Sequence, residues 1–138
     1  MQDVKTQSFI NGEWVGSANQ IDVLNPATGE SLASVANASI SDCLQAVDAA
    51  DAAFISWRAT APRVRAEILR KAFEIMIAEQ EQLARLITLE MGKILADSRA
   101  EVAYAAEFFR WFSEEAVRID GDYRRAPGGA NWLMVSRQ

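Results

Sequence analysis

The sequence predicts a mixed α and β fold in which β-hairpins come first, about four helices follow, and a terminal strand ends the chain. Apolar and polar residues alternate around turn signals in the first third, the apolar period becomes helical at Ser39, and the tail "NWLMVSRQ" is again typical of a strand. With 138 residues, half of them hydrophobic, the chain suits one domain with helices in the majority.

Two hairpins are predicted before the first helix. In "SFINGEWVG", Asn11-Gly12 separates two short apolar segments, and both residues tolerate the positive φ of a type I′ turn. In "IDVLNPATGESLASVAN", a turn containing Pro26 and Gly29 joins two alternating segments.

The first two helices have recognisable starts. Ser39, with Asp42 three residues later, forms a variant of the capping box and opens a helix that runs to about Trp57. Pro62 is predicted as the first residue of the second helix, with Thr60 near its cap.

The later helices are bounded mainly by glycines. The third helix is expected to end near Gly92, a suitable C′ residue, and the fourth to run from about Leu95 to Ile119 until Gly121 stops it. The segment "RRAPGGA", residues 124–130, is the only loop-rich junction.

The fourth helix carries two apolar stripes, whereas a helix of a small domain usually buries one. One stripe can pack on the preceding helices, but the other needs more of the same chain, a second subunit or a ligand cavity; a central helix in an all-helical core is the alternative. The terminal strand also lacks a sequence neighbour to pair with, so both features indicate structure that is missing or supplied by another chain. The first stripe is Val102, Ala105, Phe109, Phe112, Ala116 and Ile119, and the second is Tyr104, Phe108 and Trp111.

Composition excludes several classes of function. The formal net charge of −5 argues against a nucleic-acid or anionic-membrane surface, and no apolar run is long enough to span a bilayer. The absence of histidine removes the Ser-His-Asp and Cys-His catalytic sets and makes a zinc site untenable. A single cysteine and the lack of a signal peptide in "MQDVKTQSF" fit a cytoplasmic protein.

No residue emerges from spacing alone as catalytic. Cys43 lies on the apolar side of the first helix and is expected to be a small buried core residue. Gly92-Lys93 lacks the other residues of a phosphate-binding loop. The helical glutamates are expected on solvated faces in pairs such as Glu67 with Lys71. The carboxylates to which this applies are Glu67, Glu74, Glu90 and Glu101.

An ordered set of strings nevertheless resembles one family. "FINGEWV", "NPATGE", "AVDAADAAFISWRATAPRVRAEILRKAFEIM" and "LARLITLEMGKILADSRAEVAYAAEFFRWFSEEAVRIDGD" are similar to the N-terminal region of NAD(P)-dependent aldehyde dehydrogenases, and most similar to bacterial succinate-semialdehyde dehydrogenases. The similarity covers about residues 8–123. "DYRRAP" at 122–127 and Ile94 depart from the usual pattern of the family.

This resemblance implies the N-terminal part only of an α/β aldehyde dehydrogenase fold. Residues 1–123 are then the hairpins and helices that pack beside the coenzyme-binding domain. Residues 124–138 begin the β segment of an oligomerisation arm, and the Rossmann core and catalytic domain are absent. The family oxidises an aldehyde through a thiohemiacetal on a cysteine, with hydride transfer to NAD or NADP and release of the acid by a water that a glutamate activates.

The resemblance places none of these reactive positions in this sequence, which is similar to a family member truncated after Gln138, and Cys43 comes too early to be the nucleophile. We therefore expect the isolated chain to be inactive and to bind no cofactor. Tyr104 and Phe108 occupy positions similar to those that line the aldehyde tunnel, so they are the expected substrate-binding residues. The expected partners are a small aldehyde and further copies of the chain, joined through the terminal strand. The alternative is a non-catalytic module that self-associates or pairs with full-length subunits.

Overall fold

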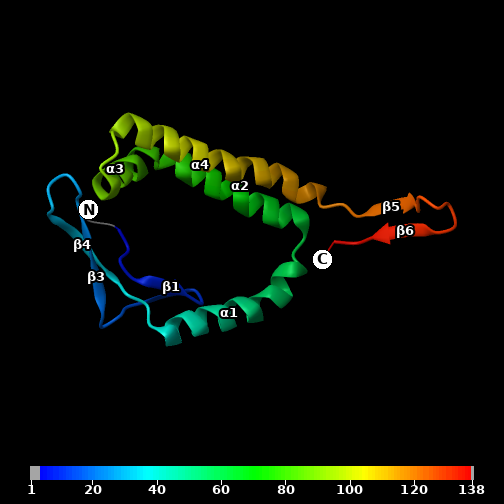
Figure 1. Cartoon of the computed structure of the whole chain (residues 1–138), viewed down its shortest axis with the longest axis horizontal. Coiled ribbons are helices and arrows are strands. Elements are labelled where there is room, and N and C mark those ends of the chain that lie inside the picture. Colours follow the sequence, from blue (N-terminus) through cyan, green and yellow to red (C-terminus); the bar gives the residue numbers. More distant parts are fainter. Residues whose placement is uncertain (1–3, 138) are drawn as a thin grey trace.

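The computed structural model describes residues 4–137 (Figure 1). Residues 1–3 and 138 belong to the predicted ranges 1–123 and 124–138 but lie outside the described residues. In the described part, two hairpins precede the helices and a third hairpin follows them. The elements are β1 (Ser8–Ile10), β2 (Glu13–Val15), β3 (Gln20–Leu24), β4 (Ser31–Ala36), α1 (Ile40–Arg58), α2 (Pro62–Ala78), α3 (Gln80–Met91), α4 (Leu95–Glu115), the 3₁₀ turn η1 (Ala116–Arg118), β5 (Asp122–Arg125) and β6 (Trp132–Val135).

Both predicted N-terminal hairpins are confirmed. β1 and β2 are antiparallel, and the two residues between them, Asn11 and Gly12, have φ angles of 51° and 83°, as the type I′ turn requires. β3 and β4 are also antiparallel, and Gly29 in the turn between them has a φ of 73°. The Asn37 N–H donates to the Asn19 carbonyl at 2.9 Å, which extends this pairing beyond the strands.

The start of α1 confirms the predicted capping box. The Ser39 hydroxyl accepts the Asp42 N–H at 3.2 Å, and the Asp42 carboxylate accepts the Ser39 N–H at 2.8 Å. Pro62 opens α2 and Thr60 lies near its cap, both as predicted, but no side chain makes a cap hydrogen bond. Ala61 is the N-cap residue, and the Thr60 hydroxyl donates back to the Ser56 carbonyl at 3.2 Å, where it serves the end of α1.

The third helix ends as predicted and the fourth ends early. Gly92 follows α3 with a left-handed φ of 73°, and its N–H donates to the Thr88 carbonyl at 2.9 Å. α4 stops at Glu115 rather than at Ile119, because the backbone tightens into η1 there. Such a tighter turn is a common way to satisfy the free carbonyls of a helix end.

The expectation of an unpaired terminal strand is wrong. β6 pairs with β5 in an antiparallel hairpin, with Arg125 opposite Trp132 and Tyr123 opposite Met134. The Tyr123 and Trp132 rings stack with centroids 5.0 Å apart and planes 7° apart. The predicted loop-rich junction therefore begins with two strand residues, and β5 spans the predicted division between residues 123 and 124.

The core lies where α2, α3 and α4 pack together, with α2 and α4 side by side along most of their length (Figure 1). Its buried side chains are small, which lets the helix backbones approach closely. The fully buried Ser98 is satisfied because its hydroxyl lies 2.9 Å from the Thr88 hydroxyl and 3.3 Å from the Ile94 carbonyl. The buried residues are Ala66, Ala84, Ser98, Val102, Ala106, Ser113 and Ala116.

The predicted first stripe of α4 is thus only partly correct. Val102 and Ala116 are buried as expected, but Phe109, Phe112 and Ile119 remain exposed. The small-residue row lies beside that stripe, and the large aromatic side chains fall at its margin, where α2 does not cover them.

An ion pair fixes α4 against α3. Arg99 of α4 donates from Nε and Nη2 to the two carboxylate oxygens of Glu81 of α3, at 2.8 and 2.9 Å. These hydrogen bonds lower the pKa of Glu81 to about 2. A second ion pair joins Lys93, just before α4, to Glu101 within it. Both contacts hold the first half of α4 in place.

The molecule exposes more surface than a closed domain of its size. Its accessible surface is 10559 Å², against roughly 7,100 Å² expected for a compact monomer of the same mass. The helices of the core form one layer, and α1 with the β1–β2 and β3–β4 hairpins forms a second that leaves much of the first uncovered (Figure 1). Large apolar residues on α1 stay exposed, namely Ile40, Leu44, Val47, Phe54 and Ile55. Within residues 4–137, no helix is long and apolar enough to cross a membrane.

Candidate functional site

The candidate site is the aromatic edge of α4, by which we mean Tyr104 and Phe108. The two rings meet edge to face, with centroids 5.0 Å apart and planes at 86°. Tyr104 is 68% exposed and Phe108 is 47% exposed, and Trp111 continues the same exposed stripe. The second stripe of α4 is therefore not covered by any described element, and the tunnel-lining role of Tyr104 and Phe108 stays a prediction.

The aromatic edge offers a surface suited to binding. Two perpendicular rings give an apolar surface, and the Tyr104 hydroxyl adds a polar group that can donate or accept a hydrogen bond. Among the described residues, no group of three or more His, Cys, Asp or Glu side chains could hold a metal ion. The arrangement is suited to shaping one wall of a binding site.

Cys43 is not the buried core residue that its position predicted. Its side chain is exposed on α1. The reason is that α1 turns its alanine face, which includes Ala46 and Ala49, toward the β1–β2 turn, where these residues and Phe9 line a small hollow. No described element covers the side of the helix that carries Cys43.

Glu67 and Glu74 lie in exposed ion pairs as expected, and the half-exposed Glu101 pairs with Lys93, whereas Glu90 has no ion pair among the described residues. Glu67 pairs with Arg70 at 2.8 Å rather than with Lys71, and Arg70 also reaches Glu74. Because these side chains are about half exposed, the pairs contribute little to stability.

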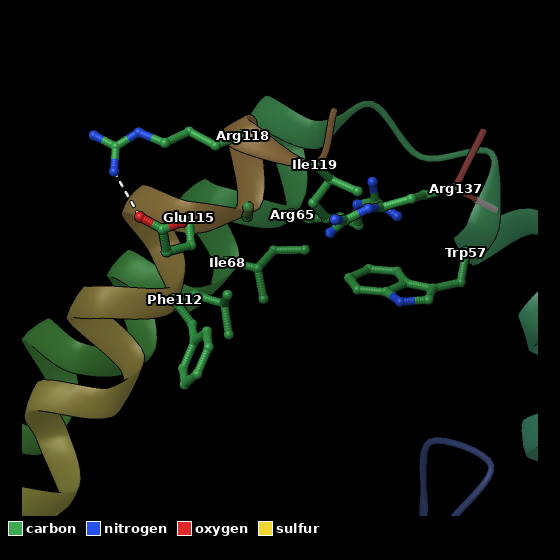
Figure 2. A pocket seen from close by; sticks show the side chains of 10 residues that line it. Trp57, Arg65, Ile68, Phe112, Glu115, Arg118, Ile119 and Arg137 are labelled. Atoms are coloured by element: carbon green, nitrogen blue, oxygen red, sulfur yellow. Dashed lines mark hydrogen bonds and ion pairs between the residues drawn. The ribbon is translucent and has the colours of Figure 1, made fainter. Parts of the chain in front are cut away.

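A pocket that the sequence did not reveal lies where Trp57, α2 and the end of α4 meet (Figure 2). Its volume is about 450 Å³, and neither Tyr104 nor Phe108 lines it. We call it the Trp57 pocket. The residues lining it come from four separate segments, so no spacing rule brings them together. They are Trp57, Arg65, Ile68, Leu69, Phe112, Glu115, Ala116, Arg118, Ile119 and Arg137.

Comparison with known proteins gives a consistent result. The chain is 55% identical over 107 residues to succinate-semialdehyde dehydrogenase of Paenarthrobacter nicotinovorans. The matched region covers 78% of this chain and 24% of that protein. It is 48% identical over 136 residues to succinate-semialdehyde dehydrogenase [NADP(+)] GabD of Escherichia coli, covering 97% and 28%. It is also 48% identical over 120 residues to glutarate-semialdehyde dehydrogenase of Pseudomonas putida, covering 86% and 25%. The chain thus spans about a quarter of the length of these relatives.

Solved structures share the fold. An NADP-dependent enzyme of E. coli superposes with a TM-score of 0.86 at 45% identity, covering 89% of this chain and 26% of that one. Betaine aldehyde dehydrogenase of Staphylococcus aureus, a point mutant in complex with NAD⁺, gives a TM-score of 0.86 at 31% identity and covers 91% and 26%. These likenesses confirm the predicted α/β fold, of which this chain forms a part. The family model for aldehyde dehydrogenases matches residues 14–138, so the chain belongs to the aldehyde dehydrogenase family.

Proposed function

We propose that this chain is the N-terminal portion of an NAD(P)-dependent aldehyde dehydrogenase that oxidises succinate semialdehyde, or a similar small aldehyde, to the carboxylic acid. The observation that carries the proposal is the 55% identity to a succinate-semialdehyde dehydrogenase over most of the chain. The similarity to a glutarate-semialdehyde dehydrogenase keeps a semialdehyde one carbon longer as the other candidate substrate. The activity belongs to a complete polypeptide about four times as long, in which these residues come first.

In that polypeptide the aromatic edge contributes to the aldehyde site. Tyr104 and Phe108 lie one helical turn apart and hold each other through their edge-to-face contact, so they form a rigid pair rather than two independent side chains. Their exposure in this chain leaves room for the aldehyde and for the further residues that complete the site. The pair is therefore proposed to bind and orient the aldehyde, and not to take part in its oxidation.

The starts of α1 and α2 are poorly suited to hold a nicotinamide dinucleotide. A dinucleotide cradle uses a glycine-rich turn whose N–H groups face the pyrophosphate at a helix N-terminus. At the start of α1 the Asp42 carboxylate accepts the Ser39 N–H, so a negative charge already lies where a phosphate would bind. α2 begins with Pro62, which has no N–H to offer. We propose that NAD or NADP, which accepts the hydride in the family reaction, binds elsewhere in the complete polypeptide and not to this chain alone.

The isolated chain is accordingly proposed to be inactive. The test is a spectrophotometric assay of nicotinamide reduction with succinate semialdehyde and either NAD⁺ or NADP⁺, with the E. coli relative as the positive control. We expect no reduction by these 138 residues and clear reduction by the relative. Aldehyde-dependent reduction by the isolated chain would overturn the proposed inactivity.

A second proposal concerns assembly. The β5–β6 hairpin projects beyond the helices (Figure 1), and every residue of both strands is exposed, including Met134 at 82%. An exposed apolar strand is a template for pairing with another chain. We propose that the hairpin joins copies of the chain into a homo-oligomer, in the enzyme or, as the alternative function, in a non-catalytic module. A cytoplasmic location is part of the same proposal, since the single cysteine suits a reducing compartment.

A further inference from the structure

The Trp57 pocket is built like a small-molecule site. Its volume of about 450 Å³ lies within the range of roughly 300–1,000 Å³ that is usual for such sites. The walls are mainly apolar, and the charged side chains reach in from the rim, as Figure 2 shows for Arg65 and Arg137 beside the Trp57 ring. Apolar walls with a few convergent polar groups are the usual composition of a ligand pocket.

The charges around the pocket are unbalanced toward the positive. Three arginines and one glutamate line it, although the chain as a whole has a formal net charge of −5. Arg118 donates from Nη1 to the Glu115 carboxylate at 2.6 Å, so this pair is neutralised. Within residues 4–137, neither Arg65 nor Arg137 has a carboxylate within ion-pair distance. Two positive charges are thus left facing one hollow.

Arg65 has a further unmet requirement. Its Nε is buried and has no hydrogen-bond partner among the described residues. A buried N–H donor on a charged group is costly to leave unpaired, and buried polar groups in folded proteins are nearly always hydrogen-bonded. The position of this donor in the wall of an open pocket indicates an acceptor that enters from outside.

The chemistry of the walls selects the acceptor. A guanidinium group matches a carboxylate in geometry, because two parallel N–H groups can donate to its two oxygens. Ile68 and Phe112 offer no hydrogen bonds and Trp57 offers only its indole N–H, so these walls favour a hydrocarbon or an aromatic body over a sugar with many hydroxyls. A monocarboxylate with a compact apolar body can place its carboxylate at the guanidinium groups and its body against the apolar walls.

We propose that the Trp57 pocket binds a small monocarboxylate with an apolar body, whose carboxylate is held by Arg65 and Arg137 and whose body packs against Trp57, Ile68 and Phe112. This site is separate from the aromatic edge and does not depend on the proposed enzymatic activity. A semialdehyde acid is a poor ligand for it, because its polar aldehyde end would lie against apolar walls.

The test is a titration of the ¹⁵N-labelled 138-residue chain with 3-phenylpropionate, followed by amide and indole chemical shifts. Trp57→Phe identifies the Trp57 indole signal. We expect saturable shifts centred on Trp57, Arg65 and Phe112, with a dissociation constant of millimolar order or below. The neutral amide 3-phenylpropionamide and the short acid acetate should each bind at least tenfold more weakly, a difference of about 1.4 kcal/mol. Equal binding of the acid and its amide, shifts elsewhere on the molecule, or no saturable shift would overturn the proposal.

Variants locate the carboxylate. Arg65→Gln should weaken 3-phenylpropionate binding at least tenfold, whereas Arg63→Gln, an exposed residue of the same helix outside the pocket, should leave it unchanged. The amide spectrum of each variant reports whether it folds. If Arg65→Gln does not fold, the affinity of Arg137→Gln for 3-phenylpropionate tests the proposal instead, because the exposed Arg137 side chain is not needed for packing. Unchanged affinity in Arg137→Gln and in any folded Arg65 variant would overturn the assignment.

Discussion

Arg99 of α4 donates hydrogen bonds to both carboxylate oxygens of Glu81 of α3, with N–O distances of 2.8 and 2.9 Å. The contact joins residues 18 positions apart, across the short connection between α3 and α4. Since α4 carries Tyr104 and Phe108, the same contact helps to fix the direction of the aromatic edge.

The first prediction concerns the pH dependence of this contact. Hydrogen bonds from Arg99 lower the pKa of Glu81 from 4.5 to about 2. The unfolded chain therefore binds the proton more readily than the folded chain, so the stabilisation is complete above pH 4.5 and disappears as the pH falls toward 2. Because both side chains are about half exposed, Glu81→Gln should lower the midpoint of urea unfolding only slightly at about pH 6 and leave it nearly unchanged at about pH 2.

The matched control is Glu114→Gln, an exposed residue on α4 away from the contact. Its unfolding midpoint should follow that of the parent chain at both pH values. An equal effect of Glu81→Gln at both pH values would show that the carboxylate charge is not what stabilises the contact between α3 and α4.

The second prediction compares two glycines that share a φ of 73°. An alanine at Gly29 meets open space, so Gly29→Ala should cost only the left-handed backbone energy, about 1–2 kcal/mol. An alanine Cβ at Gly92 would also lie 3.1 Å from Pro26 Cγ, in the turn of the β3–β4 hairpin. Gly92→Ala should therefore lower the free energy of unfolding by more than Gly29→Ala does, as measured by urea denaturation.

This comparison tests whether the second hairpin packs on the end of α3. Equal losses in the two variants would mean that Pro26 moves away freely and that the hairpin is not held there. Hydrogen exchange at the β3–β4 amides gives a second reading, because loss of the contact should speed exchange there in Gly92→Ala, although that substitution lies outside the hairpin.

The third prediction concerns substrate choice in the complete polypeptide that we propose. Tyr104→Ala should change the ratio of kcat/KM between succinate semialdehyde and a longer semialdehyde at least several-fold, because it removes one ring of the pair that is proposed to bind the aldehyde. Tyr104→Phe keeps the ring and should shift the ratio less. Glu114→Ala, exposed on the same helix, is the control. An unchanged ratio in Tyr104→Ala would count against the aromatic edge as part of the aldehyde site.

The fourth prediction concerns assembly through the hairpin. Sedimentation of the chain over a range of concentrations should show self-association, and Met134→Lys on β6 should weaken it, because charged residues on an exposed strand oppose strand pairing. Ser136→Lys adds the same charge just beyond the strand and should have a smaller effect. Identical sedimentation of Met134→Lys and the parent chain would exclude β6 as the contact.

Local signals in the sequence predicted the elements well. Asn11-Gly12 defined the first hairpin, Ser39 defined the start of α1, and Gly92 defined the end of α3, because each acts through its own backbone conformation or that of its near neighbours. These features depend on little outside a few residues of chain, which is why spacing rules capture them.

Features that depend on distant residues were missed. β5 has two arginines and no alternation of apolar residues, so nothing in "DYRR" indicates a strand; its pairing comes with the stacking of Tyr123 on Trp132. Burial on α4 followed the small residues that face α2, such as Ala106, rather than the large aromatic ones that a hydrophobic pattern favours. The prediction that Cys43 is buried failed for the same reason, because its burial would require another element to cover that side of α1.

The aromatic edge and the Trp57 pocket differ in the same way. Tyr104 and Phe108 could be chosen from sequence because they lie one turn apart on one helix, at positions that the family resemblance suggests for the aldehyde tunnel; that role stays a proposal. The Trp57 pocket could not, because its walls come from α1, from α2, from the end of α4 with η1 and from the residues after β6, which lie far apart in the sequence.

The most direct test of the central proposal is the intact mass of the protein purified from its own source, measured together with its activity toward succinate semialdehyde. We predict a polypeptide about four times the 15.2 kDa of these residues that contains them and reduces NAD⁺ or NADP⁺ when the aldehyde is added. A native protein of 15.2 kDa without that activity would contradict the account and would favour the non-catalytic module.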